Sequence, residues 1–191
     1  MASTRYNARK AAQVIAYLAM KEKTACLPVL KAVKLVYLAD RESLARFGFP
    51  ILDETHVSMP HGPVNSTTYS HINGEEDLDV CGWSQFLQAR ENHQIAVVPG
   101  LSDDDLDELS EADIVCLDSV WERFGTMTKW EIRDWTHDQN NVPEWEDPQG
   151  SSRPIPLGRT LRYLNIPHAD AQAELIKEHR QLDDLFAMLH W

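Results

Sequence analysis

The stretch that decides the fold is Lys34-Leu35-Val36-Tyr37-Leu38-Ala39-Asp40-Arg41. It lies within residues 28–47, where Pro28 suits a first helical turn and Gly48 suits a left-handed stop, so the pattern predicts a helix. At 100° per residue, one side of this helix is apolar and the other polar. We expect the apolar side to hold Val29, Val33, Val36, Tyr37, Leu44 and Phe47, and the polar side Lys31, Lys34, Arg41 and Glu42.

Asp40 falls in the middle of the apolar side. A carboxylate there must be paired, hydrogen-bonded or protonated, because burying it bare is very costly. One interpretation is structural, with backbone N–H groups of a neighbouring loop donating to Asp40. The other is catalytic, with Asp40 as an acid or base of raised pKa. The plausible neighbours in either case are His61 and the N–H groups that follow Gly62 and Pro63.

A second informative segment is Met59-Pro60-His61-Gly62-Pro63-Val64, followed shortly by Tyr69. Gly62 permits positive φ or a close backbone approach, and Pro63 fixes the chain that leaves it. A turn of this kind is preorganised, so it loses little entropy when a partner docks. The alternative is that it only joins a strand to a helix. It is not a phosphate loop, since it has one glycine and no Gly-Lys-Ser/Thr follows.

The sequence pattern in the rest of the chain predicts further strands and helices. A strand is expected near 56–59, and a hairpin from two strands at 83–88 and 93–98. An acidic helical turn is expected over 103–108. Further helices are expected over 4–20, 66–73 with Asn65 or Ser66 as N-cap, 110–124, 128–139, 157–165 and 169–190. The sum is an α+β fold: a mostly α-helical single domain with a small antiparallel sheet.

Charge is distributed unevenly along the 191 residues. The net charge is −12, made up of +6 over residues 1–46, −15 over 47–122 and −3 over 123–191. An acidic surface repels phosphate and attracts basic partners, so we expect no nucleic-acid binding by this chain alone. The acidic region is either a contact for a basic partner or only a solvated face.

Composition also bounds the location and the chemistry. No stretch is apolar enough to span a bilayer and no signal pattern is visible, so we expect a cytoplasmic protein without a membrane partner. The three cysteines are widely spaced, which predicts reduced thiols. No histidine lies in a zinc-binding pattern and no cysteine or serine lies in a nucleophile motif. We therefore expect no catalytic residue, no metal and no cofactor.

The runs Leu35–Asp40 and His61–Val64 with Tyr69, in this order and spacing, resemble the Panacea domain family of SocA-like antitoxins. A third, weaker part of the resemblance is Trp135-Thr136-His137 with Pro143-Glu144-Trp145. It implies one domain over 1–191, with the core resemblance at 28–150 and a helical extension at 157–190.

The resemblance implies an antitoxin of a bacterial or phage toxin–antitoxin system, which neutralises a toxin from an adjacent gene by direct binding and is not an enzyme. Two alternatives are an adaptor that delivers the toxin to a cellular protease, and a hydrolase that uses Asp40 and His61. We expect partner contacts at Met59, His61, Pro63, Tyr69 and Trp145. We expect framework roles for Tyr37, Asp40, Gly62 and Pro63.

Overall fold

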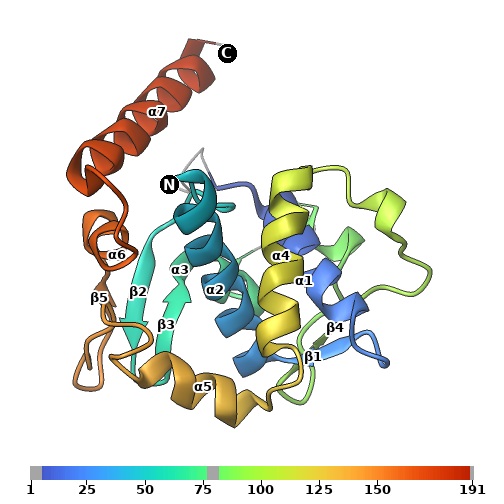
Figure 1. Cartoon of the computed structure of the whole chain (residues 1–191). Helices are drawn as coiled ribbons and strands as arrows, with labels where there is room; N and C mark the ends of the chain where they lie inside the picture. The colour runs from blue at the N-terminus through green and yellow to red at the C-terminus, as the bar shows by residue number, and fades with distance from the viewer. Residues whose placement is uncertain (1–5, 77–81, 190–191) are drawn as a thin grey trace.

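The computed structural model of the protein describes residues 6–76 and 82–189. It is 52% helical, with small antiparallel sheets of two and three strands (Figure 1), which confirms the α+β prediction. The helices are α1 (Ala8–Met20), α2 (Val29–Phe47), α3 (Ser66–Ile72), α4 (Glu111–Phe124), α5 (Lys129–His137), α6 (Leu157–Tyr163) and α7 (Ala169–Leu189). The strands are β1 (Cys26–Pro28), β2 (His56–Met59), β3 (Gly62–Asn65), β4 (Gln94–Ala96) and β5 (Arg153–Pro154), and short 3₁₀ turns lie at Trp83–Gln85 and Asp103–Asp105.

Helix α2 is the centre of the fold, because α1, α4, α5 and β3 all pack against it (Figure 1). Every residue from 31 to 40 is buried, so this helix is enclosed on all sides through most of its length. The predicted polar side is therefore wrong for Lys31 and Lys34, which are 5% and 0% exposed. Their amines are accommodated by backbone carbonyls, those of Gly125 and Pro63. Phe47, predicted to be apolar core, is 47% exposed near the end of the helix.

The predicted helix ends are largely confirmed. Gly48 ends α2 at φ 77°, in the left-handed region. Capping boxes open α4 at Ser110 and α5 at Thr128, and in both the third helical residue returns a carboxylate to the cap. The start expected for the first helix at residue 4 is wrong: Asn7 caps α1 by accepting from the backbone N–H of Lys10, so the helix begins at Ala8, and residues 4–5 lie outside the described residues.

The two sheets are antiparallel. In the larger one, β2 lies between β3 and β5, with Val57 opposite Val64 and Pro154. In the smaller one, β1 pairs with β4, and Leu27 lies opposite Ile95. The predicted strand at 56–59 is thus confirmed.

The predicted hairpin of 83–88 and 93–98 is wrong as a pair of regular strands. One isolated bridge, Leu87 with Val97, joins the two segments, and the backbone N–H groups of Gln88 and Val98 donate across it to Ala96 and Phe86. Strand β4 pairs with β1 instead. The physical reason is visible in the buried side chains of the first segment. Trp83, Phe86 and Leu87 are all at most 2% exposed, and their spacing of three and four residues suits a helical turn, which forms here, better than a strand.

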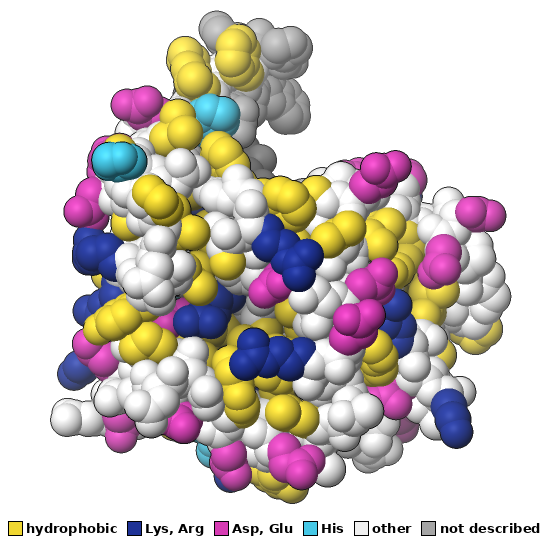
Figure 2. All heavy atoms as spheres, in the orientation of Figure 1, with side chains coloured by type: hydrophobic (Ala, Val, Ile, Leu, Met, Phe, Trp, Pro, Cys, Tyr) yellow, Lys and Arg dark blue, Asp and Glu magenta, His cyan; other side chains and the backbone are white. Residues whose placement is uncertain are grey.

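The end of the chain forms a separate small cluster. Leu44 of α2, Leu161 of α6, and Ala169 and Ile176 of α7 are buried together. Beyond Arg180, whose Nε pairs with Asp53 Oδ1, α7 stands out from the rest of the molecule (Figure 1). Apolar side chains are visible on this part of the helix (Figure 2), and Leu182, Leu185 and Phe186 are 51–57% exposed.

The acidic character of the middle of the chain is carried by the surface. On the face shown in Figure 2, Asp and Glu side chains gather over α4 and the segment that leads into it. Among the residues that the structure describes, no helix combines the length and the apolar character needed to cross a membrane.

Candidate functional site

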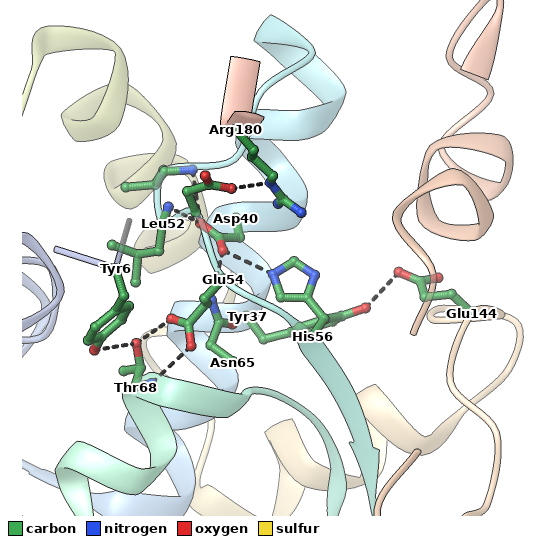
Figure 3. A network of polar contacts seen from close by, with 12 residues as sticks. Tyr6, Tyr37, Asp40, Leu52, Glu54, His56, Asn65, Thr68, Glu144 and Arg180 are labelled. Carbon is green, nitrogen blue, oxygen red and sulfur yellow. Dashed lines mark hydrogen bonds and ion pairs between the residues drawn. The ribbon is translucent and has the colours of Figure 1, made fainter. Parts of the chain in front are cut away.

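Asp40 lies at the centre of a buried polar cluster (Figure 3). Its Oδ1 accepts from the backbone N–H groups of Ile51 and Leu52, both at 2.9 Å. Its Oδ2 accepts from Asn65 Nδ2 at 2.7 Å and lies 3.0 Å from His56 Nε2. Four groups thus satisfy a side chain that is 1% exposed, as buried carboxylates require.

This arrangement fits the structural interpretation of Asp40 and corrects its expected neighbours. The donors come from residues 51–52, His56 and the side chain of Asn65, whereas among the described residues no hydrogen bond joins Asp40 to His61 or to the backbone N–H groups after Pro63. His61 is exposed. The pairing of Asp40 with His61 on which the hydrolase alternative depends is absent from the part of the chain that is described.

Glu54 extends the cluster towards α3. It accepts from the backbone N–H and the hydroxyl of Thr68 in the first turn of this helix. Burial raises the pKa of Glu54, and the bonds from Thr68 work against that rise. Asn65 occupies the predicted N-cap position, but its amide is directed to Asp40, so Glu54 takes over the capping of α3.

Tyr37 ties α2 to the loop before β5. Its hydroxyl donates to Glu144 Oε1 at 2.8 Å, and Arg41 Nε donates to the same oxygen at 2.7 Å. Glu144 is fully buried, so these two donors compensate its charge. Burial, with the Glu144 carboxylate beside it, raises the pKa of Tyr37 well above its usual value. Tyr37 therefore acts as a neutral hydrogen-bond donor.

The Met59–Val64 turn is held from behind by two aromatic side chains. Trp145 Nε1 donates to the Met59 carbonyl at 3.2 Å, and His137 Nε2 lies 2.9 Å from the Pro60 carbonyl oxygen. The Trp145 and His137 rings meet edge to face, with centroids 4.6 Å apart. The loop before β5 and the end of α5 therefore fix the turn.

Gly62 is required for the geometry of this turn. Its φ is +91°, and a Cβ at this position would lie 2.9 Å from Thr136 Oγ1 and 3.0 Å from Lys34 Nζ. Lys34 Nζ donates to the carbonyl of the next residue, Pro63, at 2.8 Å. Burial lowers the pKa of Lys34 to about 7. The turn thus lies directly on a buried amine.

A groove of about 580 Å³ opens beside this turn, between the start of α2 and the start of α5. Of the expected contact residues, Met59, His61 and Tyr69 line it. Pro63 is a buried member of the turn itself, and Trp145 is 9% exposed and supports the turn. The structure thus brings three of the five side chains to one surface, and which of them touch a partner stays a prediction.

Sequence reasoning gave no role in this groove to five basic or aromatic residues that line it. They are Lys34, Arg90, His93, Lys129 and Trp130. A signal for Lys34 was present, because the residues three and four positions away on either side are mostly apolar, as on a fully enclosed helix. Nothing in the sequence pattern places Arg90 beside α5.

No group of three or more His, Cys, Asp or Glu that could hold a metal ion is found among residues 6–76 and 82–189. The two cysteines within these ranges, Cys26 and Cys116, are free thiols, and burial raises the pKa of both. Cys81 lies outside the described residues.

Comparison with known proteins agrees with the resemblance seen in the sequence. Searches of curated proteins and of solved structures returned no match. A family model described as "Antitoxin SocA-like, Panacea domain" matches residues 33–146, which is more than half of the chain. This span includes the Asp40 cluster, the Met59–Val64 turn and the Trp145 that supports it, and the predicted family is confirmed. The chain belongs to the SocA-like antitoxin family and carries its Panacea domain.

Proposed function

We propose that this protein is the antitoxin of a toxin–antitoxin pair and neutralises its toxin by direct protein–protein binding. The observation that carries the proposal is the family match over residues 33–146. The family implies a role in a toxin–antitoxin system; the binding step is the part that we add.

The geometry of the buried carboxylates and of the groove supports a role in binding more than a role in catalysis. The buried carboxylates of Asp40, Glu54 and Glu144 all accept hydrogen bonds from the protein itself, so they serve the fold. The groove beside the Met59–Val64 turn is formed by elements that are fixed without a partner. A preformed surface of this kind loses little conformational freedom on docking.

The proposal is tested by co-expression. The open reading frame next to this gene is expressed alone and then together with this chain. We expect growth arrest in the first case and restored growth in the second, together with a complex of the two proteins on size-exclusion chromatography. Absence of rescue with either neighbouring gene would count against an antitoxin.

The same experiment separates binding from degradation. Toxin levels are followed by immunoblot in cells with and without their ATP-dependent proteases. With neutralisation by binding, we expect growth to recover while the toxin level stays constant. Recovery that depends on a protease, with a falling toxin level, would replace direct neutralisation by an adaptor role.

A further inference from the structure

The groove beside the Met59–Val64 turn has an apolar floor. Val29 and Val33 come from the first turns of α2, Val64 comes from β3, and Met59 comes from the end of β2. The three valines are buried beneath the surface, and Met59 is half-buried. An apolar side chain of a partner would therefore find apolar contacts here.

The charges of this groove are all of one sign. Lys34, Arg90 and Lys129 line it together with His61 and His93, and no Asp or Glu belongs to its lining. The whole chain carries −12, and Arg90 is the one Lys or Arg between positions 47 and 122. A cationic lining is thus the opposite of what the overall composition would place there.

These cations also lack acidic partners within the described residues. Arg90 donates to the Asn73 side-chain oxygen and lies 2.7 Å from His93 Nδ1, and Lys34 donates to a carbonyl. Neither they nor Lys129 form an ion pair with any carboxylate in residues 6–76 and 82–189. The charges of Arg90 and Lys129 are therefore available to a ligand, whereas Lys34 lies beneath the surface.

Trp130 stands at the rim of the groove and is 52% exposed. Lys129 Nζ lies 5.1 Å and the Arg133 guanidinium carbon 4.9 Å from the centre of its ring. An exposed tryptophan beside an apolar hollow is a common anchor of protein–protein interfaces. Here it adds aromatic area to a site whose charges are positive.

Lys34 is the least expected member of the lining. It lies in the groove wall beside Gly62, is not exposed, and makes one hydrogen bond among the described residues, so N–H donors remain unused. Its lowered pKa shows how poorly its surroundings support a charge. A carboxylate brought close would supply that support, because charges interact strongly where water is excluded.

We propose that this groove receives a segment of the toxin in which an apolar side chain is flanked by carboxylates, with Arg90 and Lys129 as their counter-ions and the buried Lys34 amine adding positive charge beneath the floor. This inference deepens the proposed function and rests on it. It assigns a different contact from the acidic region, which would call for a basic partner. The apolar floor and the net charge of −12 favour a peptide over a nucleic acid.

The test measures the affinity of purified full-length variants for the purified toxin from the neighbouring gene. Trp130→Ala is expected to weaken binding at least 30-fold, as anchor residues do. Its matched control is Tyr163→Ala, an aromatic residue of α6 that is 49% exposed, which should change affinity less than twofold. Lys34→Met is expected to weaken binding about tenfold.

The charge part of the proposal is tested separately. The double variant Arg90→Ala with Lys129→Ala should bind at least tenfold more weakly and lose most of the salt dependence of association. The control is Arg162→Ala with Lys177→Ala, which removes two exposed cations of α6 and α7. Circular dichroism and thermal melting verify that each variant is folded.

The toxin side is tested with a double-mutant cycle. Each Asp or Glu of the toxin is changed to Asn or Gln, and at least one is expected to show an energetic coupling to Lys34→Met or to the Arg90 and Lys129 pair. If the toxin is bound and neutralised equally well by all groove variants, the groove assignment is overturned while the proposed function stands. If no neighbouring toxin binds the unaltered protein, both fall together.

Discussion

Helix α2 carries two buried charged groups that the protein treats in opposite ways. Asp40 has four hydrogen-bond partners around its two oxygens, whereas Lys34, six residues earlier, has one carbonyl. The first group links the helix to residues 51–65 and stabilises the fold. The second lies under a surface groove, and its charge is poorly compensated. A fully paired buried charge indicates a role in the architecture, and we interpret the underpaired one as part of the proposed binding site.

The largest loss in the free energy of unfolding is expected from a substitution at Asp40, the fully paired group. Asp40→Asn removes a charge and places an amide where Asn65 and His56 donate, so we expect a loss of about 3–5 kcal/mol in the free energy of unfolding, measured with chemical denaturant. Asp170→Asn is the control, because the Asp170 side chain is 81% exposed on α7 and should change stability by less than about 0.5 kcal/mol. A loss below about 1 kcal/mol at Asp40 would contradict the architectural role.

Replacing Lys34, the underpaired group, is expected to raise the free energy of unfolding, whereas replacing Asp40 lowers it. Lys34→Met removes an amine that the fold solvates poorly and keeps a side chain of similar length, so we expect a gain of about 1–3 kcal/mol at pH 7. Lys31→Met is the matched control on the same helix. Lys31 Nζ is bonded to Glu22 Oε1 at 2.8 Å and to the Gly125 carbonyl at 2.6 Å, so its removal should be destabilising. If Lys34→Met lost as much stability as Lys31→Met, Lys34 would not differ from a paired buried charge, and the contrast with Asp40 would not hold.

The pH dependence sharpens the same contrast. The pKa of Lys34 is about 7 in the folded protein and about 10.5 in the unfolded chain. Between these values the unfolded state binds the additional proton, so this residue makes the free energy of unfolding rise with pH from about 7 to about 10. The difference between the unaltered protein and Lys34→Met should therefore shrink across this range. A difference that is constant with pH would show that Lys34 keeps its usual pKa.

A substitution in the Met59–Val64 turn, which lies over Lys34, is expected to lower the free energy of unfolding by an intermediate amount. Gly62→Ala introduces a Cβ at φ +91° and also within 3.0 Å of Thr136 Oγ1 and Lys34 Nζ, so we expect a loss of about 2 kcal/mol. Gly150→Ala separates the two causes, because Gly150 has φ +84° but no atom within 4 Å of the added carbon. It should cost about 1 kcal/mol, the backbone part alone. Equal losses at both positions would mean that the turn has room above the lysine.

The sequence pattern predicted that Asp40 is buried but not that Lys34 is buried, and the reason is physical. A carboxylate on an apolar stripe is visible at helical periodicity, so Asp40 could be assigned a buried role, although its donors His56 and Asn65 could not be named. Lys34 fell on the side expected to be polar, because Lys31, Arg41 and Glu42 lie on that side, although most residues at helical spacing from Lys34 are apolar. The groove needs residues 29–34, 59–64, 90 and 129–130 side by side, and periodicity within single elements carries no information on such proximity.

The smallest effect is expected at the hydroxyl of Tyr37, next to the Asp40 cluster. Tyr37→Phe keeps the buried ring and its edge contact with His56, with centroids 5.2 Å apart, and removes only the bond to Glu144. Glu144 then keeps Arg41 as its donor, so we expect a loss of about 1–2 kcal/mol and not the larger loss of an unpaired buried charge. Arg41→Met should cost more, because it leaves the buried Glu144 carboxylate with a neutral donor alone. If Tyr37→Phe and Arg41→Met lost equal stability, the charge of Arg41 would contribute nothing beyond its hydrogen bond to Glu144. The loop before β5, which holds Trp145 against the turn, would then be fixed by other contacts.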